Sequence, residues 1–118
     1  MMKKIIVVEN DADTLDLMNF VLEDSGYEVI RFGKTTTPEE LKSHNPNLII
    51  LDHFLGDGYG GDLCLELKNE PLTSHIPVIL YSASPGLEQI ADKSRADAYI
   101  EKPFDIVDLE KMVKELAI

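Results

Sequence analysis

Short apolar runs alternate with amphipathic segments five times along this chain of 118 residues. Their length and their β-branched residues are typical of strands. In the segments between them, apolar residues recur at helical spacing, as Leu15, Met18 and Leu22 do. A strand followed by a helix, repeated in this way, predicts a parallel sheet covered by helices on both faces. The apolar runs lie at residues 3–8, 27–32, 47–52, 76–81 and 98–100.

The polarity of these strands predicts their order in the sheet. Residues 3–8, 47–52 and 76–81 are apolar on both faces, as expected for strands in the middle of a parallel sheet. Residues 27–32 alternate between apolar and polar, which suits a strand at an edge. The pattern fits a flavodoxin-like α/β fold, a doubly wound (βα)5 parallel sheet with strand order 2-1-3-4-5. We expect one domain that spans residues 1–118.

The charge balance indicates which kinds of molecule the chain is not expected to bind. The chain has 11 Lys and Arg residues against 22 Asp and Glu residues, a formal net charge of −11. Contact with phosphate backbones needs clustered cations, so direct binding of nucleic acid is not expected. The longest apolar runs, such as residues 5–8, are far shorter than the ~20 residues that cross a bilayer, so no membrane span is expected either.

The cysteine and histidine residues also limit the kinds of disulfide, metal and catalytic site that the chain can form. The single cysteine, Cys64, excludes a disulfide framework and a multi-cysteine zinc site, and it suits a reducing compartment, the cytoplasm. It lies on an apolar helical stripe, which indicates a buried and unreactive thiol. His44, His53 and His75 are scattered in predicted loops without the spacing of metal ligands. Of these, His53 is next to Asp52 and could line a site there.

Polar residues follow the predicted strands at one edge of the sheet. Glu, Asn and Asp occupy residues 9–11 after the first strand, Asp52 ends the third, Ser82 follows the fourth and Lys102 follows the fifth. Ligands of open α/β sheets bind at this edge, where the strand order reverses. Side-chain oxygens can hold Mg²⁺, an aspartate can accept a phosphoryl group, and a hydroxyl and an ammonium can bind its oxygens. The residues therefore suit a site for phosphoryl transfer.

At these residues the sequence resembles the receiver domains of response regulators, the phosphorylated switches of two-component signalling. The resemblance extends over the whole chain. Each motif alone is weak, but together they occur in order at strand ends that the hydrophobic pattern places independently. The motifs are residues 5–11 (IIVVEND), 48–52 (LIILD), Gly60, 78–83 (VILYSA) and 96–104 (ADAYIEKPF).

The resemblance implies roles for the acidic residues and their neighbours. Asp52 would accept phosphate from a phosphohistidine on a sensor histidine kinase or a phosphotransfer protein. Glu9, Asn10, Asp52 and the backbone carbonyl of Phe54 would surround Mg²⁺. The chain would act as a phospho-aspartate switch toward a downstream target. It would be an enzyme at most for its own phosphorylation and dephosphorylation.

The resemblance also implies how the switch would work. Lys102 would pair with the phosphoryl group, and the family often holds the following bond to Pro103 in the cis form. Ser82 and Tyr99 would move inward on phosphorylation and change the face formed by the fourth helix, the fifth strand and the fifth helix. The ordinary alternative for Tyr99 is a half-buried residue that only fills space.

Two residues depart from the family pattern. The second acidic position, usually an aspartate, is Asn10, which predicts weaker binding of Mg²⁺. Asp11, the next residue, could replace the missing carboxylate or cap the helix that follows it. Gly56 stands where the family usually has proline, which predicts a more mobile loop. Asn10 also keeps open a second interpretation, a pseudo-receiver that binds partner proteins with weak or no phosphorylation.

Other activities on the same fold fit less well. A flavin carrier needs a loop rich in Ser, Thr or Gly after the first strand, whereas residues 9–13 (ENDAD) would repel phosphate. A phosphatase of the haloacid-dehalogenase type has a second aspartate two residues after its nucleophile, and this chain has Phe54 there. A signalling switch is therefore the preferred interpretation.

Overall fold

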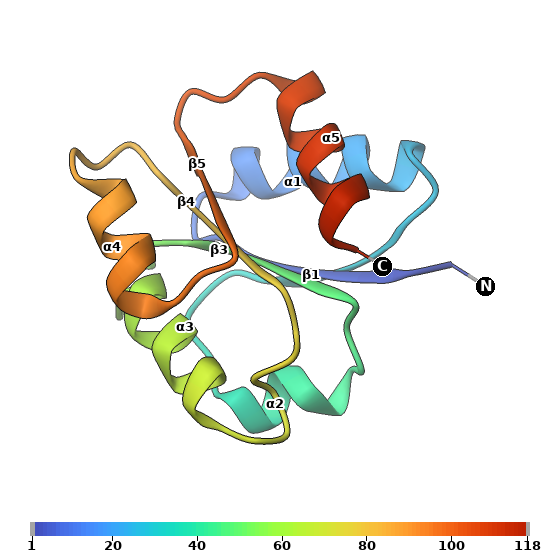
Figure 1. The fold of residues 1–118 in the computed structure, drawn as a ribbon. Coiled ribbons are helices and arrows are strands. Elements are labelled where there is room, and N and C mark those ends of the chain that lie inside the picture. Colours follow the sequence, from blue (N-terminus) through green and yellow to red (C-terminus); the bar gives the residue numbers. More distant parts are fainter. Residues whose placement is uncertain (1, 118) are drawn as a thin grey trace.

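Strands and helices alternate strictly through residues 2–117, which the computed structural model describes (Figure 1). The strands are β1 (Lys4–Val8), β2 (Glu28–Phe32), β3 (Leu48–Asp52), β4 (Val78–Ser82) and β5 (Ala98–Glu101). The helices are α1 (Ala12–Asp24), α2 (Pro38–Ser43), α3 (Gly60–Asn69), α4 (Leu87–Ser94) and α5 (Ile106–Leu116). No helix in this part of the chain is long and apolar enough to cross a membrane.

The strands form one sheet in the order β2-β1-β3-β4-β5, and every neighbouring pair is parallel. This is the doubly wound, flavodoxin-like arrangement that the alternating pattern predicts, and the prediction is confirmed. β3 and β4 are buried along their whole length, whereas β2 has no fully buried residue. The strand order reverses between β1 and β3, and the carboxyl ends of all strands meet at one edge of the sheet.

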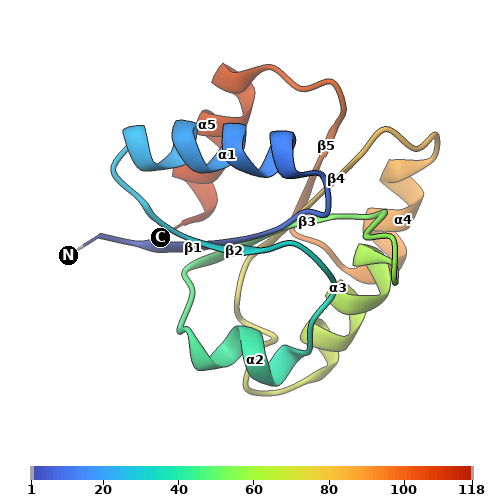
Figure 2. The same ribbon diagram turned by 180° about the vertical axis from the view of Figure 1, so that it is seen from behind.

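Helices cover both faces of the sheet, as Figures 1 and 2 show. α1 and α5 lie on one face and pack on alternate strand residues, such as Val7, Ile50 and Tyr81. α2, α3 and α4 lie on the other face and pack on the residues between them, such as Val8 and Leu51. These two apolar layers fix the register of the central strands, because a slip of one residue would exchange the faces.

Side-chain caps fix the starts of three helices. Asp11 Oδ2 accepts a hydrogen bond from Thr14 N at 3.0 Å at the start of α1. Asp105 Oδ1 accepts one from Val107 N at 2.8 Å at the start of α5, and Thr37 caps α2 in the same way. Each cap satisfies a backbone N–H that has no partner within its helix, so these starts are set by local sequence.

The start of α4 differs from the sequence-based prediction. Ser84 and Pro85 are typical of a cap and a first helical residue, but α4 begins only at Leu87. Ser84 N instead donates to Ser82 Oγ at 3.1 Å, so this segment continues from β4 as a turn. Gly86 then has a φ of 81°, a left-handed conformation that separates the turn from the helix.

Candidate functional site

Three charged side chains from distant parts of the sequence meet at the carboxyl edge of the sheet. Glu9 follows β1, Asp52 ends β3 and Lys102 follows β5. Lys102 Nζ donates to Glu9 Oε1 at 3.0 Å and to Asp52 Oδ2 at 3.3 Å. The two acidic residues are almost fully buried, with Glu9 1% and Asp52 4% exposed. Two buried carboxylates therefore share one ammonium, so their charges are only partly neutralised.

Tyr81 belongs to the same cluster, although the sequence pattern marks it only as part of a buried strand. Its side chain is fully buried, and its hydroxyl donates to Glu9 Oε1 at 2.8 Å. The Lys102 ammonium lies 4.6 Å from the centre of its ring, a cation–π contact. The sequence does contain a signal for this role. Tyr81 ends an aliphatic strand sequence, and a buried tyrosine hydroxyl needs a hydrogen-bond partner.

Because the two carboxylates are buried next to each other, their pKa values move apart. The pKa of Asp52 is raised to about 6. The causes are burial, a hydrogen bond with Glu9 and the negative charge of Glu9, and the attraction of Lys102 acts in the opposite direction. Burial opposes the ionisation of Glu9, but hydrogen bonds with Asp52, the Asp11 amide, Tyr81 and Lys102 lower its pKa overall. Glu9 is thus the firmly ionised member of the pair, and Asp52 is the one that takes up a proton more readily.

Asn10 lies beside Glu9 and reaches toward the loop after β3. The orientation of its amide follows from the surrounding hydrogen-bond network. The inward atom of the amide lies 3.2 Å from Glu9 Oε2 and 3.1 Å from the Phe54 carbonyl oxygen; both are acceptors, so we assign the nitrogen to this place, where it can donate to both. The Asn10 side chain therefore connects the residues that follow β1 with those that follow β3.

The residues present fit a magnesium ion in the chemistry of their donors. Carboxylate, amide and backbone carbonyl oxygens are the ligands that Mg²⁺ prefers, with water completing the coordination. The Asn10 amide contacts Glu9 Oε2 and the Phe54 carbonyl oxygen, and Phe54 N donates to Asp52 Oδ1 at 3.2 Å, so Asn10 and Phe54 connect the two carboxylates. Within residues 2–117 no group of three or more His, Cys, Asp or Glu side chains has a metal-binding arrangement. The site offers two carboxylates and neutral oxygens.

Asp11 uses its carboxylate as the side-chain cap of α1 in this structure. Its Oδ2 accepts hydrogen bonds from Thr14 N at 3.0 Å and from Thr14 Oγ1 at 2.6 Å. These bonds lower the pKa of Asp11, so the carboxylate remains ionised in its role as a cap. The Asp11 amide also donates to Glu9 Oε2 at 3.1 Å. Of the two roles considered for Asp11, the structure shows the helix cap.

Ser82 lies at this edge of the sheet, but its hydroxyl is hydrogen-bonded to a neighbouring residue of the chain. The residue is buried, and its Oγ accepts a hydrogen bond from Ser84 N. Its carbonyl oxygen accepts a bond from Lys102 N at 2.9 Å. In the described part of the chain, no hydrogen bond joins Ser82 to Asp52. Ser82 is therefore connected to the charged cluster through the backbone of Lys102.

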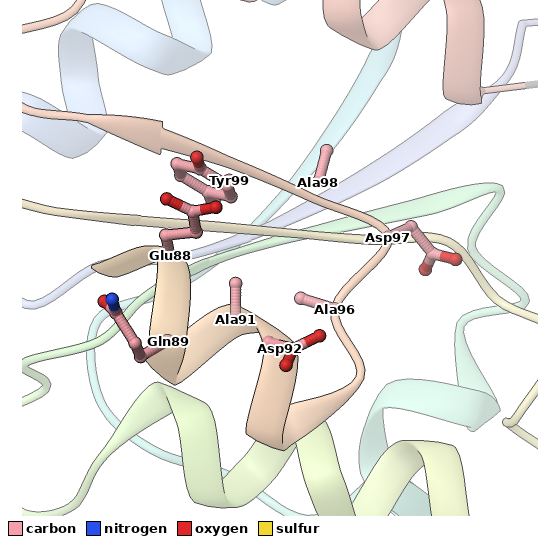
Figure 3. A pocket seen from close by; sticks show the side chains of 8 residues that line it. All are labelled: Glu88, Gln89, Ala91, Asp92, Ala96, Asp97, Ala98 and Tyr99. Carbon is pink, nitrogen blue, oxygen red and sulfur yellow. The ribbon is translucent and has the colours of Figure 1, made fainter. Parts of the chain in front are cut away.

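Tyr99 lies farther from the charged cluster. It is half-buried on β5, where Leu80 of β4 is its register partner. Figure 3 shows it beside a pocket between α4 and β5, whose lining includes Glu88 and Ala91 of α4. The Tyr99 side chain therefore contributes to the surface that α4 and β5 form together.

Gly60 lets the loop after Asp52 pass close to β3. Gly60 N donates to the His53 carbonyl oxygen at 2.7 Å, and a Cβ at this position would lie 2.1 Å from the Asp52 carbonyl oxygen. Only glycine allows so close an approach. Phe54 and Tyr59 form an antiparallel bridge across the loop, and their rings lie 5.9 Å apart. The structure therefore gives a steric reason for the glycine.

His53 and Cys64 have structural roles. His53 Nδ1 accepts a hydrogen bond from Gly61 N at 3.1 Å, and burial lowers the pKa of His53, which favours this neutral acceptor form. Cys64 is fully buried, and burial raises the pKa of its thiol to about 11, which agrees with an unreactive residue. Gly56 has a φ of 82°, and the Lys102–Pro103 peptide bond is cis.

Comparison with known proteins identifies the family. A family model described as the response regulator receiver domain matches residues 5–114. The chain therefore belongs to the response regulator receiver domains, the signalling switches of two-component systems. The resemblance found in the sequence motifs is confirmed.

Two relatives differ in how much of their own length this chain spans. The chain is 34% identical to the phosphate regulon transcriptional regulatory protein PhoB of Escherichia coli K12, over 97% of this chain and 51% of PhoB. It is 31% identical to the polar-differentiation response regulator DivK of Brucella ovis, over 97% of this chain and 95% of DivK. The chain thus spans about half the length of PhoB and nearly all of DivK.

Solved structures show the same fold. A CheY-like receiver domain protein from Methanospirillum hungatei JF-1 is 31% identical, with a TM-score of 0.83 over 99% of this chain and 94% of that one. A receiver domain protein from Clostridium thermocellum is 26% identical, with a TM-score of 0.86 over 98% of this chain and 94% of that one. The similarity covers the sheet and the helices on both of its faces.

Proposed function

We propose that this receiver domain is a phospho-aspartate switch that accepts a phosphoryl group on Asp52. One observation carries the proposal: Asp52 ends β3, is nearly buried, and has the Lys102 ammonium 3.3 Å from its Oδ2. A buried carboxylate with a shifted pKa next to a cation is typical of a reactive site. The phosphoryl donor would be a phosphohistidine of a sensor histidine kinase or a phosphotransfer protein.

In the proposed reaction, an Asp52 oxygen attacks the phosphorus atom of the donor. The new O–P bond forms as the N–P bond of the phosphohistidine breaks, and the electron pair of that bond returns to the imidazole. Lys102 would turn from Glu9 toward the phosphoryl oxygens and pair with them. The Tyr81 hydroxyl would stay on Glu9 Oε1, so the buried carboxylate keeps a donor when Lys102 moves.

The residues that would hold Mg²⁺ are Glu9, Asn10, Asp52 and the backbone carbonyl of Phe54. When bound, the ion would neutralise charge between the carboxylates and the incoming phosphoryl oxygens. Asn10 supplies an oxygen without a negative charge. We therefore expect a lower affinity than a site with three carboxylates would have.

The proposed output is a change in the surface formed by α4, β5 and α5. The Ser82 hydroxyl would turn toward the phosphoryl group, and Tyr99 would move inward with it. The bond from Lys102 N to the Ser82 carbonyl supports this coupling, because it links the end of β4 to the start of the segment after β5. The downstream target would distinguish the two states by this surface.

We propose further that this chain acts in the cytoplasm and contacts proteins rather than nucleic acid. A net charge of −11 disfavours contact with phosphate backbones. The name of PhoB describes a transcriptional regulatory protein, but the matching part is about half of PhoB. The single free cysteine suits a reducing compartment.

Intact-mass measurement after incubation with acetyl phosphate and Mg²⁺ tests the function. The wild type should gain one phosphoryl group, and chelation of the metal should prevent this. Asp52→Ala should gain none. Asp57→Ala, which removes an exposed carboxylate from the same loop, is the matched control and should react like the wild type. Equal phosphorylation of Asp52→Ala would show that the assignment is wrong.

A pseudo-receiver is the second candidate, and the Asn10 amide is the observation that favours it. With its nitrogen assigned to the inward position, the amide would donate to Glu9 Oε2 and to the Phe54 carbonyl oxygen and so connect the two without a metal ion. A folded wild type that stays unphosphorylated at high concentrations of acetyl phosphate and Mg²⁺ would support this alternative.

A further inference from the structure

The inward atom of the Asn10 amide lies between two acceptors. It is 3.2 Å from Glu9 Oε2 and 3.1 Å from the Phe54 carbonyl oxygen. A nitrogen in this place donates one hydrogen bond to each of them. An oxygen in the same place would face two other oxygens with no proton between them, an arrangement that a cation would stabilise.

The carboxylate of Glu9 is fully hydrogen-bonded in this arrangement. Oε1 accepts from the Tyr81 hydroxyl and from Lys102 Nζ, and Oε2 accepts from the Asp11 amide and the Asn10 amide. Four donors make a nearly buried charge tolerable without a metal ion. Asn10 supplies the one donor of these four that an aspartate at the same position would lack.

We propose that the Asn10 amide is a reversible substitute for the metal ion. In the metal-free protein its nitrogen bridges Glu9 and the Phe54 carbonyl. When Mg²⁺ binds, the amide makes a half turn about its Cβ–Cγ bond and presents its oxygen to the ion instead. The inference deepens the proposed function and rests on it, since it concerns the same metal site.

An amide is suited to this exchange in a way that a carboxylate is not. It carries a donor and an acceptor on one planar group of almost equal shape, so a half turn replaces one by the other. Asn10 is exposed at the edge of the site, and the terminal torsion of asparagine is broad and nearly two-fold. Mg²⁺ must therefore displace two hydrogen bonds, which lowers its affinity beyond the loss of one charge.

Solution NMR of the Asn10 side-chain NH₂ group tests the exchange in the wild type. Its signals are identified by their absence from the spectrum of Asn10→Asp. In EDTA, the hydrogen-bonded amide should exchange slowly with water. Addition of Mg²⁺ should shift its ¹⁵N signal and speed its exchange, because the NH₂ group then turns toward solvent. Fast exchange in EDTA would overturn the proposal.

The same titration separates this inference from the proposed function. Backbone shifts at Asp52 and Phe54 show whether Mg²⁺ binds at all. If Mg²⁺ binds and Asp52 is phosphorylated while the Asn10 amide signals stay unchanged, the exchange is wrong and the switch stands. If the amide responds to Mg²⁺ while Asp52 is never phosphorylated, the exchange stands and the switch is wrong. If no Mg²⁺ binds, both are wrong.

Substitutions at the same residue give a second test. Asn10→Asp has the shape of the amide but no donor, so its thermal unfolding midpoint should fall in EDTA, and its Mg²⁺ affinity should rise by more than the roughly tenfold expected from one added charge. Asn19→Ala is the control, because it removes another asparagine that donates to a glutamate, Glu23, away from the site. Its Mg²⁺ affinity should equal that of the wild type. An Asn10→Asp variant as stable in EDTA as the wild type would contradict the bridging role.

Discussion

At the scale of single residues, the site is defined by the hydrogen bonds and ion pairs of its buried charged groups. Glu9 and Asp52 share the Lys102 ammonium, and the Tyr81 hydroxyl supplements it on Glu9. Burial and the charge of Glu9 raise the pKa of Tyr81, so its phenol remains a neutral donor at neutral pH. Removing any one donor leaves a buried acceptor short of a bond, which costs more than the bond itself contributes.

Tyr81→Phe should lower the free energy of unfolding by about 1.5–3 kcal/mol in EDTA, because it removes a hydrogen bond to a buried ionised carboxylate and keeps the ring. Urea denaturation measures the change. Tyr99→Phe, a half-buried tyrosine on β5, is the control and should change stability by less than about 0.5 kcal/mol. Similar losses in the two variants would show that the bond to Glu9 is not responsible.

The pH dependence of stability should report the raised pKa of Asp52. Its pKa is about 6 in the folded protein against an ordinary 3.8, so the folded state binds a proton at higher pH than the unfolded state does. Through this residue, the metal-free protein gains stability as the pH falls from above 6 toward 4. Glu9 has the opposite effect, because its pKa is lowered: its stabilisation is present above its ordinary pKa of 4.5 and is lost as the pH falls below that value, at the acid end of this window.

The matched variant for this prediction is Asp52→Asn, which is neutral at every pH. We expect it to be more stable than the wild type at pH 7.5 and nearly equal to it at pH 5. Urea denaturation in EDTA at several pH values measures the difference. A difference that stays constant from pH 7.5 to pH 5 would be inconsistent with a carboxylate that titrates near 6.

At the scale of elements, the segment between β3 and α3 fixes the direction of the Asp52 backbone. Gly60 N bonds to the His53 carbonyl, and Phe54 and Tyr59 bridge the loop. The close passage at Gly60 leaves no room for a side chain. The loop is therefore held by contacts between its own residues. The left-handed backbone conformation of Gly56 also contributes to its shape.

Gly60→Ala should destabilise the protein by at least ~2 kcal/mol, because its Cβ would collide with the Asp52 carbonyl oxygen. The shift of the backbone should also slow phosphorylation of Asp52. Thermal unfolding and intact-mass labelling measure the two effects. Gly33→Ala is the control, since a Cβ there meets nothing within 4 Å, and it should change neither. A Gly60→Ala variant with normal stability would mean that the loop can move aside.

At the scale of the whole molecule, the strand order joins the site to a distant surface. β3 lies next to β4, and β4 lies next to β5. The phosphoryl group that we propose on Asp52 would therefore act on Ser82 and Lys102 and, through β5, on the surface beside α4. The two apolar layers on either side of the sheet would hold the strands in place during such a change.

Addition of beryllofluoride, a phosphoryl mimic, should shift backbone amide signals mainly in residues 82–105. The physical reason is the chain of contacts from Asp52 through Lys102 to the end of β4. Two-dimensional NMR with Mg²⁺ present measures the shifts, and Asp52→Ala should abolish them. Shifts confined to residues 52–61 would show that the site is not coupled to the α4–β5–α5 surface.

The sequence by itself determined the order of the elements and the position of β2 at an edge, and it offered Asp11 as a helix cap. It also placed Asp52, Ser82 and Lys102 at one edge of the sheet. These features follow from hydrophobic periodicity and from hydrogen bonds between residues two or three positions apart. Such interactions act within a short segment, so they can be recognised without knowing where the rest of the chain lies.

Only the tertiary structure decided which of these groups touch. Tyr81 reaches Glu9 across 72 positions of the sequence, and Lys102 reaches Glu9 across 93. The Asn10 amide finds its acceptors only because β1 and β3 are neighbours in the sheet. These bonds depend on strand register, burial and side-chain direction together. No local pattern encodes them, because each is a property of two segments that meet only when the sheet has formed.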